Sequence, residues 1–327
     1  MSAQFRDSIP SLQIGLLLPT YDGMVGGQTP RWDDLLAIAQ RAESLGFDAL
    51  WVVDHLVIPV DRYVPQAEPM GAWECWSLLA ALAAATSRIK LGSLVTCTAF
   101  RNPALLAKMA DTVDEVSGGR LILGLGAGSI PNEFAAFGYP ADHRVDRFEE
   151  ALTIVRGLLH GESVTLDGRY YQTQECELRP RGPRPDGLPI LVGARSPRMD
   201  RLAARHADIW NAAWPNRAET LAPRIAAIDA ACDEVGRDPE SLERTVGMMV
   251  DLPGLGPSPD WLWAKIVREP NRPLTGSAEE IAAELQACVA LGVTHAQVWL
   301  DPPGLDGVEA FAPVLELLGR GGTDGWD

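Results

Sequence analysis

The stretch RLILGLGAGS, residues 120–129, decides between two folds, because an apolar run leads into glycines at positions 124, 126 and 128. It could open a dinucleotide-binding loop, which requires G-x-G-x-x-G, a helix directly afterwards and an acid at the end of the next strand. Counted from the first or second glycine, the sixth position is Ser129 or Pro131. The next helical pattern begins only near Arg144, and the acids that follow lie inside it. The stretch is therefore better interpreted as a strand of another α/β fold.

Apolar strand-like runs alternate with amphipathic helical runs on both sides of this stretch. The expected strands cover residues 12–18, 48–54, 89–96, 120–126, 189–193, 208–212, 243–250 and 295–300. The expected helices cover residues 31–46, 73–86, 103–119, 144–159, 197–206, 218–236, 277–292 and 308–319. The strands are continuous apolar runs, as in parallel sheets that are covered on both faces. Eight βα units favour a closed TIM (β/α)8 barrel, with a doubly wound sheet as the alternative.

No linker divides the chain, so one domain over residues 1–327 is expected. An insertion at about 160–188 follows the fourth βα unit, and its sequence VTLDGRYY predicts a hairpin with a D-G turn. A second long loop is expected at about 251–276, with five prolines.

Composition excludes several classes of protein. The net charge of −16 argues against nucleic acid as a partner, because like charges repel. The sequence has no apolar run of the roughly 18 residues that cross a bilayer, and its first residues carry no secretion signal, so no membrane association is expected. Five cysteines without a C-x-x-C pair favour a reducing cytoplasm over disulfides or a zinc site.

Two glycine-containing segments are candidate binding elements. Residues 126–128 lie at the end of the fourth strand. Bare backbone there allows a flat ring or a substrate to lie close, or it only allows a helix to pack on the barrel. The sequence LVGARSPR, residues 191–198, places Ser196 before a proline at a helix start, with Arg195 and Arg198 beside it. A helix N-terminus of this kind binds anions, although a plain N-cap explains the same pattern.

Other chemistries find little support. None of the five histidines has metal-ligand spacing, so no catalytic metal is expected. No lysine ends a strand, which disfavours Schiff-base chemistry, and G-x-S-x-G is absent. His55 ends the second strand at the face that carries barrel active sites and is the best candidate for a proton donor, although a structural or cofactor-orienting role is equally compatible.

The chain resembles the luciferase-like monooxygenase superfamily, and more closely its branch of coenzyme F420 (deazaflavin)-dependent oxidoreductases. The motifs that carry this resemblance, in the family's order, are AESLGFDALWVVDH (42–55), AAATSRIKLGSLVT (83–96), RNPALLAK (101–108), GGRLILGLGAG (118–128), DRFEEAL (146–152) and PILVGARS (189–196). No single motif is decisive, but their joint order over about residues 12–215 is specific.

The resemblance implies a flavin-type cofactor across the C-terminal mouth of the barrel. It implies cofactor contacts at Asp54 and His55, and a bulge at Ser93, Leu94 and Val95 under the ring, with a cis peptide at Leu94–Val95. Further implied contacts are Thr96 at the ring edge, Gly126, Ala127 and Gly128 at the border of the pocket, and Gly193, Ala194, Arg195 and Ser196 around the cofactor phosphate. Relatives that oxidise sugar phosphates carry an acid where this chain has Ser129, which argues against that substrate class.

The function expected from the residues and the resemblance together is hydride transfer between coenzyme F420 and an organic small molecule, with His55 as proton donor or orienting group. The alternatives are a monooxygenase that uses reduced flavin mononucleotide (FMN) and oxygen, and a non-catalytic ligand-binding barrel. Cys97, Ser129, Trp214 and Trp299 are candidates for the substrate pocket, although a buried inert thiol explains Cys97 and core packing explains either tryptophan. A partner reductase that supplies reduced cofactor and a homodimer are also expected from the resemblance.

Overall fold

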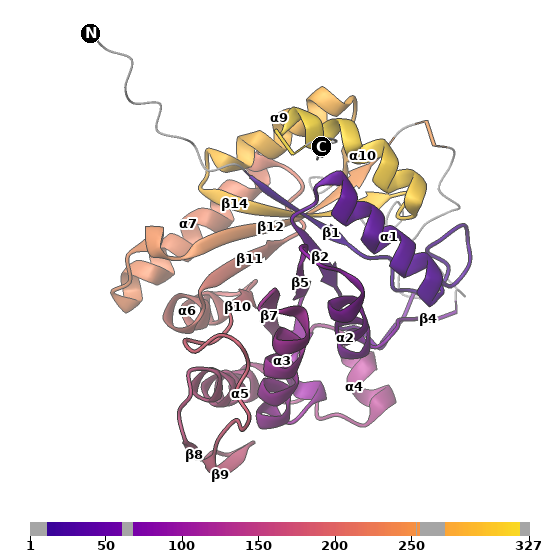
Figure 1. Ribbon diagram of the computed structural model, residues 1–327. Helices are drawn as coiled ribbons and strands as arrows, with labels where there is room; N and C mark the ends of the chain where they lie inside the picture. The colour runs from indigo at the N-terminus through magenta and orange to yellow at the C-terminus, as the bar shows by residue number, and fades with distance from the viewer. Residues whose placement is uncertain (1–11, 61–67, 253, 256–271, 321–327) are drawn as a thin grey trace.

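Eight parallel strands close into a barrel in the computed structural model, which describes residues 12–60, 68–252, 254–255 and 272–320 (Figure 1). The strands are β1 (Gln13–Leu17), β2 (Ala49–Val52), β5 (Lys90–Ser93), β7 (Leu121–Gly126), β10 (Ile190–Gly193), β11 (Ile209–Ala213), β12 (Glu243–Asp251) and β14 (Val293–Asp301). Neighbouring strands pair in parallel around the ring, and β7 with β10 and β14 with β1 complete the circle. The predicted TIM barrel is confirmed.

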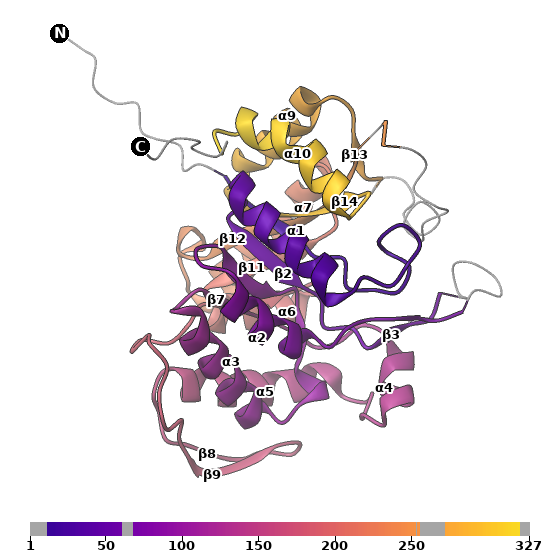
Figure 2. The same cartoon turned by 45° about the vertical axis from the view of Figure 1, so that its right-hand side comes forward.

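An outer layer of helices surrounds the barrel (Figures 1 and 2). It consists of α1 (Trp32–Leu45), α2 (Cys75–Ala85), α3 (Pro103–Ser117), α5 (Arg144–Leu159), α6 (Pro197–His206), α7 (Ala218–Val235), α9 (Ala278–Val289) and α10 (Leu305–Leu317). Gly46 and Gly118 end α1 and α3 in the left-handed conformation, because glycine adopts it without a Cβ clash. No helix in the described ranges is both long enough and apolar enough to cross a membrane.

Several short strands and one short helix lie outside the eight βα units. They are the pair β3 (Val57–Ile58) and β4 (Met70–Gly71), the strands β6 (Thr96–Cys97) and β13 (Leu274–Thr275), and the helix α4 (Pro131–Phe137). The expectation that no helix begins before Arg144 was wrong, because α4 precedes it; two turns are too short to show helical periodicity. The hairpin predicted in the insertion is confirmed as β8 (Val164–Asp167) and β9 (Gln172–Cys176). Much of the long loop expected at 251–276 lies outside the described residues.

Buried apolar side chains form one layer between strands and helices and a second cluster inside the barrel. Trp51 fills the inside of the barrel, and two glycines on neighbouring strands make room for it. A Cβ at Gly15 or Gly92 would lie only 2.3 Å from the Trp51 indole. The indole Nε1 donates to His295 Nε2 at 3.3 Å, so the buried histidine serves as its acceptor.

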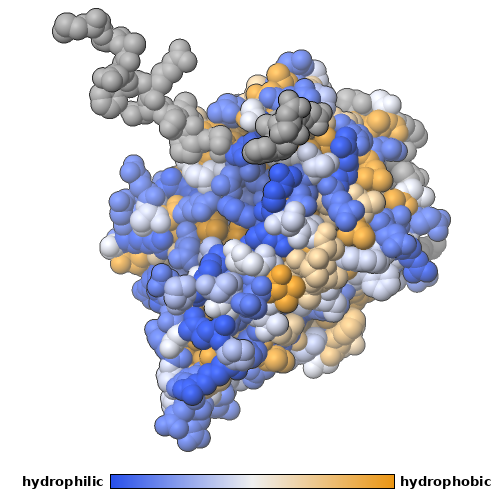
Figure 3. Space-filling model, in the orientation of Figure 1, coloured by the Kyte–Doolittle hydropathy of each residue, from blue (hydrophilic) through white to orange (hydrophobic). Residues whose placement is uncertain are grey.

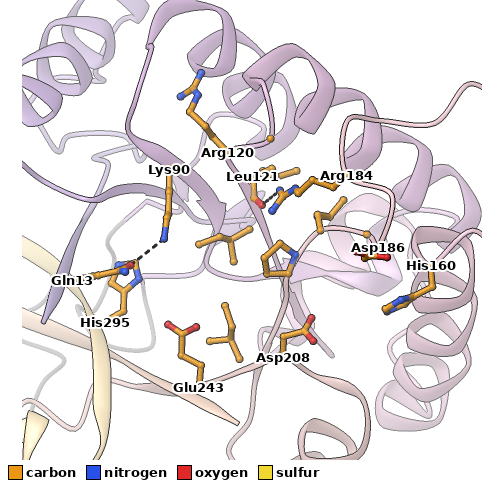
Figure 4. A pocket seen from close by; sticks show the side chains of 16 residues that line it. Gln13, Lys90, Arg120, Leu121, His160, Arg184, Asp186, Asp208, Glu243 and His295 are labelled. Carbon is orange, nitrogen blue, oxygen red and sulfur yellow. Dashed lines mark hydrogen bonds between the residues drawn. The ribbon is translucent and has the colours of Figure 1, made fainter. Parts of the chain in front are cut away.

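A cavity of about 410 Å³ opens at the N-terminal mouth of the barrel (Figure 4). Its lining carries both signs of charge, and several of these groups have partners within the chain. Lys90 donates to Gln13 at 3.3 Å, Arg184 pairs with Asp114, and Asp208 accepts the amide of Ile190. The first and last of these contacts join residues at the starts of strands, and the second joins the insertion to α3, which indicates a structural role for this mouth.

Candidate active site

A cavity of about 490 Å³ lies at the C-terminal mouth of the barrel, formed by the ends of strands from β2 to β12. Most of the residues predicted for the site line it. They are Asp54, His55, Leu94, Val95, Cys97, Gly126, Ala127, Gly128, Ser129, Gly193, Ala194, Arg195, Ser196 and Trp214. The structure thus brings together segments that lie up to 160 residues apart in the sequence, as expected for the active face of a barrel.

The floor of the cavity is a bulge between β5 and β6. The Leu94–Val95 peptide is cis, at the bond that the resemblance implies. Glycines on the adjacent strands admit the bulge: a Cβ at Gly124 would lie 1.9 Å from the Ser93 carbonyl oxygen, and one at Gly126 would lie 2.6 Å from Val95. These glycines therefore allow close packing that leaves the Leu94–Val95 segment at the cavity surface.

Three predicted site residues do not line this cavity. The Ser93 hydroxyl donates to the Gly124 carbonyl at 2.8 Å and accepts its amide at 3.1 Å, so it holds the bulge against β7. The Thr96 side chain is fully buried, and its hydroxyl has no hydrogen-bond partner among the described residues. Trp299 lies behind Trp214, at 5.5 Å between ring centroids.

Asp54 is engaged by the protein itself. Its carboxylate accepts two hydrogen bonds from Arg101, at 2.6 and 2.9 Å, and one from the amide of Cys97 at 2.9 Å. Arg101 also pairs with Glu74, whose carboxylate caps the first turn of α2. Burial raises the pKa of Asp54 from its ordinary value, although Arg101 acts in the opposite direction. Asp54 thus organises the wall of the cavity through a buried ion pair.

His55 faces the cavity with 29% of its side chain exposed. Its Nδ1 lies 3.0 Å from Oε2 of Glu133, a residue of α4. The other oxygen of Glu133 accepts the amides of Leu56 and Val57, at 2.6 and 3.3 Å. The carboxylate consequently orients the imidazole and holds the segment that follows it.

Cys97 and Gly128 illustrate packing at the edge of the cavity. Burial raises the pKa of the Cys97 thiol to about 12, so it is protonated at neutral pH and is a poor nucleophile. Gly128 has φ of +77°, and a Cβ there would lie 2.6 Å from Phe134 and 2.7 Å from the Cys97 sulfur. Both residues therefore shape the cavity wall that α4 completes.

Two arginines line the cavity, Arg144 at the start of α5 and Arg195 just before α6. Ser196 caps this helix, and Pro197 occupies its first turn, as predicted. Arg195 and Arg144 both line the cavity, and Arg144 donates to the Gly128 carbonyl at 3.1 Å. Arg198, by contrast, pairs on the surface with Asp146 and Glu149. The guanidinium groups of Arg144 and Arg195, together with the start of α6, are donors suited to an anion, and we call this set the arginine cradle.

Trp214 forms a third wall of the cavity. Trp214 has φ of +62°, and its amide donates to the Gly247 carbonyl at 2.9 Å, so its indole lies over bare backbone. Behind it the rings continue through Trp299 to Tyr21, with centroids 6.0 Å apart, and on to His55 at 6.2 Å. This row of rings lies behind the cavity wall and connects Trp214 with His55, the candidate proton donor.

Sequence reasoning missed Glu133, Arg144 and Arg101. Glu133 lies in the two-turn helix α4, and Arg144 in the first turn of α5. The pattern P-N-E after the glycines was the available signal for α4, because proline is typical of the first helical position. Within the described ranges, no group of three or more histidine, cysteine or acidic residues is arranged to hold a metal ion.

The family model for luciferase-like monooxygenases matches residues 12–252. The chain belongs to the luciferase-like monooxygenase family. The match covers seven of the eight barrel strands, together with the cavity described above.

Relatives within this family are similar over most of the chain. Over 215 residues, or 65% of the chain, it is 36% identical to the F420-dependent hydroxymycolic acid dehydrogenase of Mycobacterium tuberculosis and 34% identical to the 5,10-methylenetetrahydromethanopterin reductase of Archaeoglobus fulgidus. The matched regions span 57% and 58% of those proteins. A solved F420-dependent secondary alcohol dehydrogenase, in complex with an F420–acetone adduct, shares the fold with a TM-score of 0.78 at 23% identity, over 94% of this chain and 99% of that one.

Proposed function

We propose that this member of the luciferase-like monooxygenase family is an oxidoreductase that transfers a hydride between coenzyme F420 and an organic small molecule. The observation that carries the proposal is the single cavity that combines the Leu94–Val95 floor, the arginine cradle and His55. Two of the relatives named above are F420-dependent by name, which favours the deazaflavin over FMN.

The residues present fit such a cofactor. A flat ring needs a smooth floor, which the Leu94–Val95 bulge supplies. An anionic tail needs hydrogen-bond donors, which the arginine cradle supplies. When bound, the deazaflavin ring supplies or accepts the hydride. The chain's own residues bind the cofactor, and His55 exchanges the proton.

We assign the proton transfer to His55. With Nδ1 held by Glu133, Nε2 is the ring atom left to face the ligand. Nε2 donates a proton to the oxygen of a carbonyl substrate as it becomes an alcohol, or accepts that proton in the reverse direction. The lining side chains of Val95, Phe100 and Trp214 favour an uncharged, apolar body for this substrate.

Titration of the purified protein with F420 and with FMN, each followed by ring fluorescence, tests the proposal. Saturable binding of F420 with no binding of FMN supports it. Binding of FMN alone would favour the two-component monooxygenase that uses reduced FMN and oxygen, and binding of neither would favour a barrel for another ligand.

Replacing Arg195 by alanine should weaken F420 binding about tenfold to a hundredfold, because a charge-assisted hydrogen bond to an anion is worth roughly 1.5–3 kcal/mol. The loss should shrink as salt is added, since salt screens exposed charges. Arg198→Ala is the matched control, because its guanidinium pairs on the surface with Asp146 and Glu149. Equal affinities of the two variants would refute the cradle.

We also propose a homodimer through the outer face of α2. This helix carries no charged residue, and Ser77, Ala80 and Ala84 are exposed along it. Figure 3 shows an apolar stretch over this part of the surface, to which α3 adds the exposed Leu105 and Val116. Two chains of charge −16 repel each other, so self-association favours a face without acids.

Ala80→Glu should convert the dimer to a monomer in sedimentation velocity, because it buries a carboxylate without a partner at the interface. Ala287→Glu, which places the same change on an exposed position of α9, should leave the dimer intact. A monomeric wild type, or identical behaviour of both variants, would contradict this interface.

Two expectations about the cellular setting belong to the same proposal. All five cysteines are free, which supports a reducing compartment, and we place the protein in the cytoplasm. A partner reductase or dehydrogenase would regenerate the cofactor after each turnover.

A further inference from the structure

We propose that Glu133 is the positioning residue of His55: it fixes a proton on Nδ1 and thereby reserves Nε2 for proton exchange with the substrate oxygen. The inference rests on the proposed function of His55 and deepens it by naming the group on which that histidine depends.

The geometry of the pair carries the proposal. Glu133 is 1% exposed, and its Oε2 lies 3.0 Å from Nδ1 of His55. A carboxylate can only accept here, so the hydrogen bond requires a proton on Nδ1. A buried carboxylate beside one nitrogen of an imidazole selects the tautomer and the ring orientation, as in the outer ligand shells of metal sites.

No other acid of the cavity is placed for this task. Asp54 is the second acidic residue among the described lining residues, and Arg101 with the Cys97 amide occupies its carboxylate. Glu133 is therefore the acid of the cavity lining whose carboxylate contacts His55.

The titratable groups around His55 are few. Glu133 faces it from α4, and Tyr21 from the segment after β1 with ring centroids 6.2 Å apart. Asp54 precedes it in the chain, and Cys97 of β6 lines the same cavity. Burial keeps Tyr21 and Cys97 neutral by raising the pKa of each. Because Arg101 pairs with Asp54, Glu133 is the acid that contacts the imidazole.

A purely structural role is the competing explanation, since Glu133 also binds the amides of Leu56 and Val57. Glu133→Gln separates the two roles. The glutamine oxygen can still accept the two amides, whereas its NH2 group would donate to Nδ1 of His55. If Glu133 positions His55, the tautomer of His55 should reverse in this variant. If Glu133 only holds the two amides, the tautomer should not change.

The experiment is long-range proton–nitrogen NMR of the 15N-labelled protein without cofactor, at a pH well above the ordinary histidine value of about 6.5. His55→Asn assigns the signals. We expect neutral His55 in the wild type to carry its proton on Nδ1, and the ratio of the two tautomers to shift at least about tenfold toward Nε2 in Glu133→Gln.

Asp146→Asn is the matched control, because Asp146 and His143 form an exposed pair at the same distance of 3.0 Å. This change should alter His143 and leave His55 as it is. A proton on Nε2 in the wild type, or the same tautomer in Glu133→Gln, would overturn the proposal. If Glu133→Gln does not fold, the wild-type spectrum alone decides. Since no cofactor is present, failure of F420 to bind would leave this result intact.

Discussion

Replacing His55 by asparagine is expected to lower kcat by about 100-fold to 10,000-fold while changing the Kd for F420 only slightly. Removing a general acid or base costs this much because the proton must then come from a group that is not positioned for the transfer. Asparagine keeps a polar side chain of similar reach, so the cavity is preserved. The measurement is steady-state oxidation of reduced F420 by a ketone that the wild type reduces, followed by absorbance.

His160→Asn is the control for this prediction, because His160 lies exposed at the opposite mouth of the barrel. Its rate should match the wild type. Retention of more than about a tenth of the wild-type rate by His55→Asn would assign the proton to water or to another group. The histidine would then have the orienting role that the sequence left open.

The stability of the protein should fall steeply in acid because of His295. Burial, and then the positive charges of Lys90 and Arg320, lower the pKa of His295 from 6.5 to about 3. The unfolded chain binds a proton below pH 6.5, whereas the folded chain keeps this imidazole neutral until about pH 3. The stabilisation is therefore complete above pH 6.5 and is lost as the pH falls toward 3. Each pKa difference of one is worth about 1.36 kcal/mol, so the full effect is roughly 5 kcal/mol at most.

Urea unfolding of the wild type and of His295→Gln at a series of pH values tests this. Glutamine can accept the indole hydrogen bond of Trp51 but does not titrate, so the free energy of unfolding should depend less on pH in the variant. His160→Gln, at an exposed position, should follow the wild type. Parallel curves for His295→Gln and the wild type would show that the imidazole is already protonated or accessible in the folded state.

The sequence predicted more of the cavity floor than of its chemistry. Leu94, Val95, Gly126 and Gly193 could be placed because they lie within motifs shared with a family. Glu133 could not, because a seven-residue helix has no readable period and its partner His55 is 78 residues away. Thr96 was assigned to the ring edge from the resemblance, and Trp299 to the substrate pocket from its position near a strand end. Side chains alternate across a strand, however, and a shift of one residue moves a side chain away from the cavity. The contacts of all these residues with a cofactor remain predictions, as does the organisation of the chain as a single domain.

By itself the sequence determined the barrel, because eight apolar runs separated by eight amphipathic helical runs can be buried together only in a few ways. It also determined where the helices end, since glycine and proline act on the backbone within a few residues. Only the tertiary structure decided the role of RLILGLGAGS. Gly124 and Gly126 serve the approach of the Ser93–Val95 bulge, and Gly128 serves the packing of Phe134 and Cys97. Only the tertiary structure, too, paired His55 with Glu133 and Asp54 with Arg101. Such pairs depend on distances across the barrel, and no local pattern of residues encodes a distance between segments that meet only on folding.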